Sequence, residues 1–410
     1  MDSQIPSTES IETRLQGSKP PAPVRTFQAA NVIAVSATHA IQDTYGGFLP
    51  PLLPKLIAHF SLSNAEAGVL AGLLDMPSLL QPLIGHFADR LDLSLLVYIC
   101  PAVTAIMMSL LGAAPDYGTL ALLLVLAGLS RAAFHAVGPA VAGRLSGRRL
   151  GRGMGFWMVG GQLGPALGPI LVVSAVQSRG LPGLTWLALP GLVGSMLLYL
   201  RLRQVPVKPS PASGLRIGKT TLSAMAPMML LLVGTVSVQS FMAAGLSIFL
   251  PVYMTEQGAD LWTAGIALTV LQGAGTFGSL LSGTLSDRWG RRATLLAAFL
   301  VGPAFMIWFL RSDAWARMLP LFLLGLTTKS TMAVFMALVQ ESFPDHRALA
   351  NSIFLSVTFV VRSLVGVVVG GLGDRFGLHW AFTASAAVFM LGVPLVMLLP
   401  TAPPPAKTVA

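Results

Sequence analysis

Charged residues are scarce in this sequence, because Asp, Glu, Lys and Arg together make up only 10% of its 410 residues. A typical soluble domain contains roughly 25% charged residues. Hydrophobic residues reach 54% and gather in runs near the roughly 20 residues that a helix needs to cross a bilayer. The composition excludes a water-soluble globular protein and predicts an all-α integral membrane protein.

Cysteine is almost absent as well. Cys100 is the single cysteine and lies within an apolar run, which excludes a disulfide framework and a thiolate metal site. A Walker loop, a His-Glu-x-x-His motif and a Gly-x-Ser-x-Gly motif are also missing. We therefore expect no enzymatic activity, no metal and no cofactor. A non-transporting sensor or scaffold stays open as a lower-ranked alternative, although the polar segments are too short for a soluble domain.

Acidic residues are outnumbered by basic ones, 16 to 26, which gives a net charge of +10. The cations lie in short segments between apolar runs and form no basic face with exposed aromatics, so no nucleic-acid partner is expected. With the N-terminus in the cytoplasm, 18 Lys and Arg residues fall on the cytoplasmic side and five on the other. The positive-inside rule then predicts a protein of the cell inner (plasma) membrane with both termini cytoplasmic.

The apolar runs divide the chain into twelve predicted transmembrane spans in two halves. Residues 1–26 are expected to be a disordered cytoplasmic tail, 203–221 a cytoplasmic linker rich in proline and charge, and 401–410 a second cytoplasmic tail. The N-terminal half, 27–202, contains predicted spans at 27–49, 65–87, 93–112, 118–141, 153–176 and 183–201. The C-terminal half, 222–400, contains predicted spans at 222–252, 262–285, 293–310, 316–340, 348–371 and 379–399.

Proline and tryptophan refine this prediction. Pro50, Pro51 and Pro54 are expected to end the first span, and Pro77 and Pro82 to kink the second, because proline interrupts helical hydrogen bonding. Six tryptophans near the ends of spans are interpreted as anchors at the membrane interface; they are Trp157, Trp186, Trp262, Trp308, Trp315 and Trp380.

A short motif repeats along the chain. Residues 85–90 (Gly-His-Phe-Ala-Asp-Arg) follow the second span and recur 198 positions later as residues 283–288 (Gly-Thr-Leu-Ser-Asp-Arg). A fainter copy at 370–377 follows the eleventh span, on the predicted opposite side. Repeated three-helix units of alternating orientation within six-helix halves are typical of major facilitator transporters.

The second copy, Gly283-x-x-x-Asp287-Arg288-x-Gly290-Arg291-Arg292, resembles the loop motif of the major facilitator superfamily. This resemblance implies the major facilitator fold and a latch at the cytoplasmic ends of the helices. The first copy departs from the motif, since Asp92 stands where glycine is expected and no basic pair follows. The residues that the resemblance assigns to the latch are Asp89, Arg90, Asp287, Arg288, Arg291 and Arg292.

The fifth span resembles the helix-packing motif of drug–proton antiporters, although proline stands at the last position where that motif prefers glycine. Its residues are Gly160, Gly164, Pro165, Gly168 and Pro169. Glycines four residues apart let a neighbouring helix approach closely. The segments 38–43, 79–82, 134–135 and 340–341 are similar to the fosmidomycin resistance protein group, and Arg131 matches an arginine that family members carry in the fourth helix.

Five charged side chains fall deep inside predicted spans: Asp43, Asp75, Arg131, Lys329 and Arg362. Each costs about 2.5–3.5 kcal/mol at the bilayer centre on insertion scales. We expect them to line an aqueous cavity between spans 1, 2, 4, 10 and 11. An alternative is that pairs such as Asp43 with Arg131 only hold helices together.

These residues suggest two roles. His39 and Asp43, one helical turn apart, are the predicted proton-coupling pair, because histidine titrates near physiological pH; Asp75 is the next candidate. Arg131, His135, Lys329 and Arg362 are the predicted substrate-binding residues, since Arg and Lys suit carboxylate and phosphate groups. Lys329 paired with Glu341 stays open as an alternative.

Together these features predict a secondary transporter with a midplane site. The resemblance favours proton-coupled efflux of a small anionic or zwitterionic compound, and proton-coupled uptake of an organic anion is the alternative. The expected partners are a small-molecule substrate, protons and the lipid bilayer, and the expected oligomeric state is a monomer.

Overall fold

The computed structural model describes residues 26–88, 93, 95–203, 219–343 and 347–400, and these residues form helices and short connections without a β-strand. Most of the tail 1–26, the linker 204–218, the segment 401–410, and Asp89 and Arg90 of the predicted latch lie outside the described residues. The all-α fold class is therefore confirmed for the described part of the chain.

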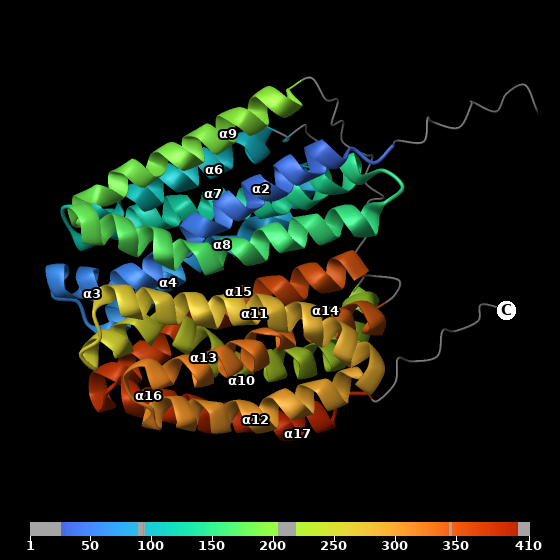
Figure 1. Cartoon of the computed structure of the whole chain (residues 1–410). Coiled ribbons are helices and arrows are strands. Elements are labelled where there is room, and N and C mark those ends of the chain that lie inside the picture. Colours follow the sequence, from blue (N-terminus) through green and yellow to red (C-terminus); the bar gives the residue numbers. More distant parts are fainter. Residues whose placement is uncertain (1–25, 89–92, 94, 204–218, 344–346, 401–410) are drawn as a thin grey trace, which may run out of the picture.

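The helices form two halves that pack side by side, with the blue-to-green half above the yellow-to-red half in Figure 1. The N-terminal half consists of α2 Ala29–Gly46, α3 Leu49–Phe60, α4 Asn64–Asp75, α5 Gln81–Ala88, α6 Leu95–Ser109, α7 Tyr117–Ser146, α8 Leu150–Arg179 and α9 Ala188–Leu202. The C-terminal half consists of α10 Lys219–Glu256, α11 Leu261–Trp289, α12 Arg291–Arg311, α13 Met318–Leu324, α14 Thr331–Ser342, α15 Arg347–Phe376, α16 Leu378–Met390 and α17 Gly392–Met397.

Eleven helices, some with a bend inside them, are long and apolar enough to cross a membrane among the described residues. The broken helix α2–α3 supplies the twelfth span. Here the sequence prediction of a span that ends at residue 49 is wrong, because α3 continues to Phe60. Pro50 and Pro51 occupy the first turn of α3, where backbone N–H groups need no intrahelical partner. The interruption lies instead at Gly47 and Phe48, between the two helices.

Two other spans are interrupted where charged residues lie. In the second span a 3₁₀ turn, Met76–Leu80, separates α4 from α5 and follows Asp75 directly. This turn contains Pro77, one of the two prolines predicted to kink the span. In the tenth span a π-helical turn, Gly325–Lys329, separates α13 from α14. Such turns occur frequently at functional sites, because they rotate side chains away from a regular helical register.

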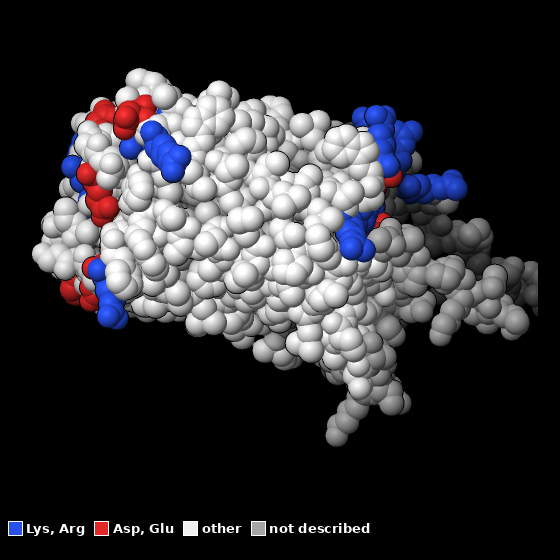
Figure 2. Space-filling model, turned by 90° about the horizontal axis from the view of Figure 1, so that it is seen from below, with Lys and Arg blue, Asp and Glu red and all other residues white. Residues whose placement is uncertain are grey.

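The bundle has two ends of different charge. We call the end where α2 begins and α9 ends the tail end, and the end where α3 and α8 finish the far end. Figure 2 shows charged residues at both ends of the visible face, an uncharged band between them, and acidic residues mainly at one end. The five cations that the sequence analysis placed away from the cytoplasm all lie at the far end, in or beside the ends of α3, α8, α12, α13 and α15: Lys55, Arg179, Arg311, Arg317 and Arg375.

The two halves meet closely at the far end through α4 and α15. The backbones approach so closely at Gly68 that an added Cβ atom would collide with the carbonyl oxygen of Gly366. Nearer the end, Asp374 of α15 accepts hydrogen bonds from the backbone N–H groups of Asn64 at 2.7 Å and Ala65 at 2.9 Å. We call this contact between α4 and α15 the far-end seal.

Candidate transport site

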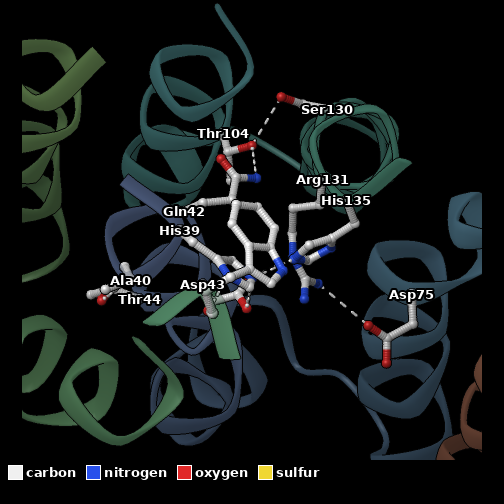
Figure 3. Close-up of polar contacts among 11 residues, drawn as sticks. His39, Ala40, Gln42, Asp43, Thr44, Asp75, Thr104, Ser130, Arg131 and His135 are labelled. Carbon is white, nitrogen blue, oxygen red and sulfur yellow. Dashed lines mark hydrogen bonds and ion pairs between the residues drawn. The ribbon is translucent and has the colours of Figure 1, made fainter. Parts of the chain in front are cut away.

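A cluster of two histidines and one carboxylate lies between α2 and α7 (Figure 3). The His39 Nε2 atom is 3.2 Å from Asp43 Oδ2, and His135 Nε2 is 3.2 Å from Asp43 Oδ1. The two histidine Nε2 atoms are themselves 3.2 Å apart. The structure brings His39 and Asp43 together, as their predicted pairing requires, and it also brings His135, which the sequence analysis assigned to substrate binding, against Asp43.

Trp157 of α8 completes the surroundings of His39. Its ring is buried and stacks on the imidazole with 3.8 Å between the ring centroids. Its backbone carbonyl oxygen is 2.9 Å from His39 Nδ1. The sequence interpretation of Trp157 as an interfacial anchor is wrong, because position near the end of a span carries no information about the direction in which a ring points.

The same three residues could also hold a metal ion, because their possible ligand atoms all lie within 4.8 Å of one another. Arg131 lies one helical turn from His135 on α7. Both the carboxylate of Asp43 and the guanidinium of Arg131 therefore act on any charge that enters the cluster.

A second charged group lies beside this cluster and joins the two halves. Arg131 Nη1 donates to Asp75 Oδ1 at 3.4 Å, and Arg362 Nε of α15 lies 3.8 Å from Asp75 Oδ2. Arg131 therefore pairs with Asp75 and not with Asp43, and the alternative pairing of Asp43 with Arg131 is wrong. Asp75 is the last residue of α4 and lies directly before the 3₁₀ turn Met76–Leu80.

Both arginines keep unused hydrogen-bonding capacity. The buried Nε atoms of Arg131 and Arg362 have no hydrogen-bond partner among the described residues. A buried donor without a partner costs about 1–3 kcal/mol. An anionic ligand that accepts from these atoms would recover that free energy.

Lys329 lies with Arg362 in a cavity of about 60 Å³ within the C-terminal half. The wall combines cationic, polar and apolar groups from α10, α14, α15 and the π-helical turn: Gln239, Ser240, Ala243, Ala244, Lys329, Met332, Thr358 and Arg362. Gln239 donates to the backbone carbonyl of Thr328 at 2.8 Å, which fixes the turn beside Lys329. The sequence analysis missed Gln239, because an uncharged amide in an apolar span gives a weak signal.

The alternative pairing of Lys329 with Glu341 is wrong, because Glu341 pairs with Arg291 instead.

A chain of polar side chains supports α2 from its other side. Gln42 donates to Thr104 at 2.8 Å, and Thr104 donates to Ser130 at 3.0 Å (Figure 3). Ser130 donates in turn to the backbone carbonyl of Cys100 at 2.8 Å. These bonds join α2, α6 and α7 within the apolar interior. They hold the helix that carries His39 and Asp43 at a fixed rotation.

The predicted helix-packing motif lies against this same helix. A Cβ atom added at Gly160 would collide with the backbone carbonyl oxygen of Ser36. A Cβ atom added at Gly164 would lie 2.7 Å from both Ala40 O and Asp43 Cβ. At Gly168 an added Cβ would lie 2.5 Å from the carbonyl oxygen of Thr44. Glycine here lets α8 approach α2 closely enough to reach the histidine cluster. Pro165 and Pro169 both lie inside α8, which remains helical through them.

The described part of the predicted latch forms a network at the tail end. Arg291 Nη1 is 2.6 Å from Asp287 Oδ1, and Arg291 Nη2 is 2.7 Å from Glu341 Oε1 at the end of α14. These contacts tie α11 and α12 to α14 within one half. Arg288 lies in the last turn of α11, and Arg292 lies in the first turn of α12.

Comparisons with known proteins agree with this architecture. The family model of the Major Facilitator Superfamily matches residues 35–323 and 264–410. The Fosmidomycin resistance protein of Escherichia coli (strain K12) is 24% identical over 380 residues, which cover 90% of this chain and 92% of that protein. The Uncharacterized MFS-type transporter YfnC of Bacillus subtilis (strain 168) is 26% identical over 386 residues, with 90% and 92% covered.

A solved structure shares the fold. The bacterial homologue of the human lysosomal transporter Spinster, in an inward-facing and unoccupied conformation, superimposes with a TM-score of 0.79 at 16% identity. The superposition covers 93% of this chain and 98% of the other. The family match spans most of the sequence. The chain belongs to the Major Facilitator Superfamily and is a multi-pass membrane transporter, not an enzyme.

Proposed function

We propose that this protein exports a small anionic or zwitterionic organic compound in exchange for protons, by alternating access. The observation that carries this proposal is the position of Asp75 between Arg131 of one half and Arg362 of the other. Charges of both signs therefore lie in one place, between two bodies that move relative to each other in secondary transporters.

The chemistry of exchange follows from competition for Asp75. A zwitterion places its negative group on Arg362 and Lys329, beside the cavity that they line, and its positive group on the Asp75 carboxylate. A proton that binds Asp75 removes the negative charge that the positive group requires. Substrate and proton then exclude each other, which is the condition for antiport.

His39, Asp43 and His135 form a second proton-binding group beside this site. Asp43 is buried among two histidines at 3.2 Å, so a proton that arrives there is shared and shielded from bulk water. Arg131 pairs with Asp75 and lies one helical turn from His135 on α7. A change of charge in the histidine cluster therefore alters the electrostatic field at Asp75, and the reverse also holds. The relative that is named for fosmidomycin resistance supports the outward direction.

Uptake of an organic anion together with protons is a second candidate, and the same geometry favours it for a substrate without a positive group. A proton on Asp75 would release Arg131 and Arg362 together. Both arginines would then be available to an anion. Proton and substrate would bind together, which is the condition for symport.

The sign of proton movement on binding separates the two candidates. Purified protein in a weakly buffered solution with a pH indicator would receive an aminoalkylphosphonate, a zwitterion with one anionic and one cationic group, as the probe. Antiport predicts that binding releases protons, and symport predicts that binding takes them up. Asp75→Asn should abolish the release or uptake of protons on binding in both cases. The control variant Asp116→Asn, at an exposed position, should keep it. Binding without any proton movement would contradict coupling at Asp75.

Transport in proteoliposomes tests the role of Asp43. Asp43→Asn imitates a permanently protonated carboxyl group and should abolish pH-driven transport while substrate exchange without a pH gradient persists. His39→Ala should mainly change the pH dependence. Full pH-driven transport by Asp43→Asn would assign coupling to Asp75 alone.

A further inference from the structure

The histidine cluster contains a shortage of hydrogen-bond donors. A backbone carbonyl oxygen only accepts hydrogen bonds, so the 2.9 Å contact between His39 Nδ1 and Trp157 O requires a proton on Nδ1. In a neutral His39 ring the Nε2 atom then carries a lone pair. That lone pair faces Asp43 Oδ2 at 3.2 Å, and an ionised carboxylate oxygen also offers only lone pairs.

The third member supplies one donor for two acceptors. A neutral His135 with its proton on Nε2 can donate toward Asp43 Oδ1 or toward His39 Nε2, each 3.2 Å away. The contact between His39 Nε2 and Asp43 Oδ2 still joins two acceptors. One further proton at that contact turns repulsion into a charge-assisted hydrogen bond.

We propose that Trp157 is a positioning residue that holds His39 in the Nδ1-protonated form, so that the cluster binds its transferable proton between His39 Nε2 and Asp43 Oδ2. The role of this proton in transport rests on the proposed proton coupling. The test of the His39 tautomer does not depend on it. The charged and titratable groups around this proton are His135 and Arg131 on α7 and Asp43 on α2 itself. The described side of α8 contributes an aromatic ring, a carbonyl and glycines.

The packing of α8 explains why Trp157 reaches His39. An added Cβ atom at Gly161 would collide with the His39 ring, and one at Gly164 would lie 2.7 Å from Asp43 Cβ. Phe134 lies against the other rings, 5.5 Å from Trp157 and 5.7 Å from His39 between centroids. The imidazole is therefore held by a stacked ring and a fixed acceptor and cannot turn over to exchange its two nitrogens.

Solid-state NMR of protein in lipid bilayers, with ¹⁵N introduced only into its six histidines, measures the tautomer directly. The signal of His39 is identified by its loss in His39→Asn. We expect Nδ1 to be protonated throughout the titration and Nε2 to gain its proton on acidification. A His39 that carries its single proton on Nε2 at high pH would overturn the proposal.

Substitutions separate positioning from simple packing. Trp157→Leu keeps the backbone carbonyl but removes the stacked ring, so both tautomers of His39 should appear and the pH of half-maximal transport should shift by about one unit. Trp157→Phe should restore a single tautomer. The matched control is Trp186→Leu, whose ring is exposed and stacks with Arg179, and it should leave the His39 spectrum unchanged.

The wild-type spectrum decides the proposal even if Trp157→Leu does not fold. A folded Trp157→Leu protein with an unaltered His39 tautomer would refute the positioning role. Because the spectra require no transport, a failure of proton-coupled transport would leave the NMR result intact and would count against the proposed function alone.

Discussion

Asp374 of α15 accepts a hydrogen bond from the backbone N–H of Asn64 at 2.7 Å, which places a carboxylate of one half on the first turn of α4 in the other. The N-terminus of a helix presents free N–H groups and a partial positive charge, so an anion is stabilised there. The fainter copy of the loop motif, at residues 370–377, supplies this carboxylate. The contact ties the halves together at the far end.

Replacing this carboxylate should weaken the far-end seal. Asp374→Ala removes two hydrogen bonds and should shift the conformational equilibrium by about 1–2 kcal/mol, which corresponds to about a five- to thirtyfold change. A cysteine at Ser363, whose hydroxyl faces the carbonyl of Gly72, should then react faster with a maleimide, in a background where Cys100 is replaced.

Asp116→Ala is the matched control for this prediction. Asp116 accepts from Thr119 N at 2.8 Å within a single half, so its loss should leave the labelling rate unchanged. Equal labelling in the Asp374→Ala and parent proteins would show that the contact contributes nothing to closure.

The glycine face of α8 should tolerate no added methyl group. Gly160→Ala should destabilise the protein by about 1–3 kcal/mol through overpacking against α2, because its Cβ would collide with Ser36 O. Gly155→Ala lies on the same helix with nothing within 4 Å of an added Cβ and should be neutral. Thermal unfolding in detergent measures both. Equal unfolding temperatures for the two variants would contradict the close packing.

The cations of the cavity should control substrate affinity. Lys329→Met or Arg362→Met should weaken binding of an anionic substrate by about 1.5–3 kcal/mol, or roughly ten- to a hundredfold, per lost charge-assisted contact. Isothermal titration calorimetry with the purified protein measures this loss. Arg148→Ala at the exposed tail end should bind normally. Normal affinity in both the Lys329→Met and Arg362→Met variants would show that these residues do not bind the anionic group of the substrate.

The tail-end network should govern the rate of transport. Asp287→Asn should slow transport while substrate binding persists, because Asp287 contacts Arg291 and lies far from the midplane cavity. Glu341→Gln should cost more stability than Asp287→Asn, since the Glu341 side chain is 33% exposed and that of Asp287 is 64% exposed, and exposed ion pairs contribute less to stability. Transport assays and thermal unfolding separate the two effects. Lost binding in Asp287→Asn would contradict a conformational role.

Orientation is a separate prediction. A reporter fused after Ala410 should be cytoplasmic, and one inserted between Asp313 and Arg317 should lie on the other side, as the distribution of Lys and Arg requires. Protease accessibility in intact and permeabilised cells measures both. Reporters on the same side would contradict twelve spans.

The sequence predicted the spans well, because apolar runs bounded by charge depend on local composition alone. The sequence also singled out five charged residues inside predicted spans as candidates for the site, because a charge at membrane depth is costly and can be recognised without a structure. These residues are Asp43, Asp75, Arg131, Lys329 and Arg362. The sequence could not predict which charges meet. The partners of Asp43 and Arg131 depend on the rotation of α2 and on the 3₁₀ turn after α4, and both are set by tertiary packing. The far-end role of Asp374 was likewise hidden, because its partners are backbone atoms 310 and 309 positions away.

The approach of Gly68 to Gly366 has an electrical consequence. Two backbones that meet without intervening side chains leave no room for a file of water molecules between them, so a membrane potential would fall steeply across such a contact. A residue larger than glycine would hold the helices apart and admit water. In a membrane transporter such a gap would let ions pass and would dissipate an ion gradient without any substrate being moved.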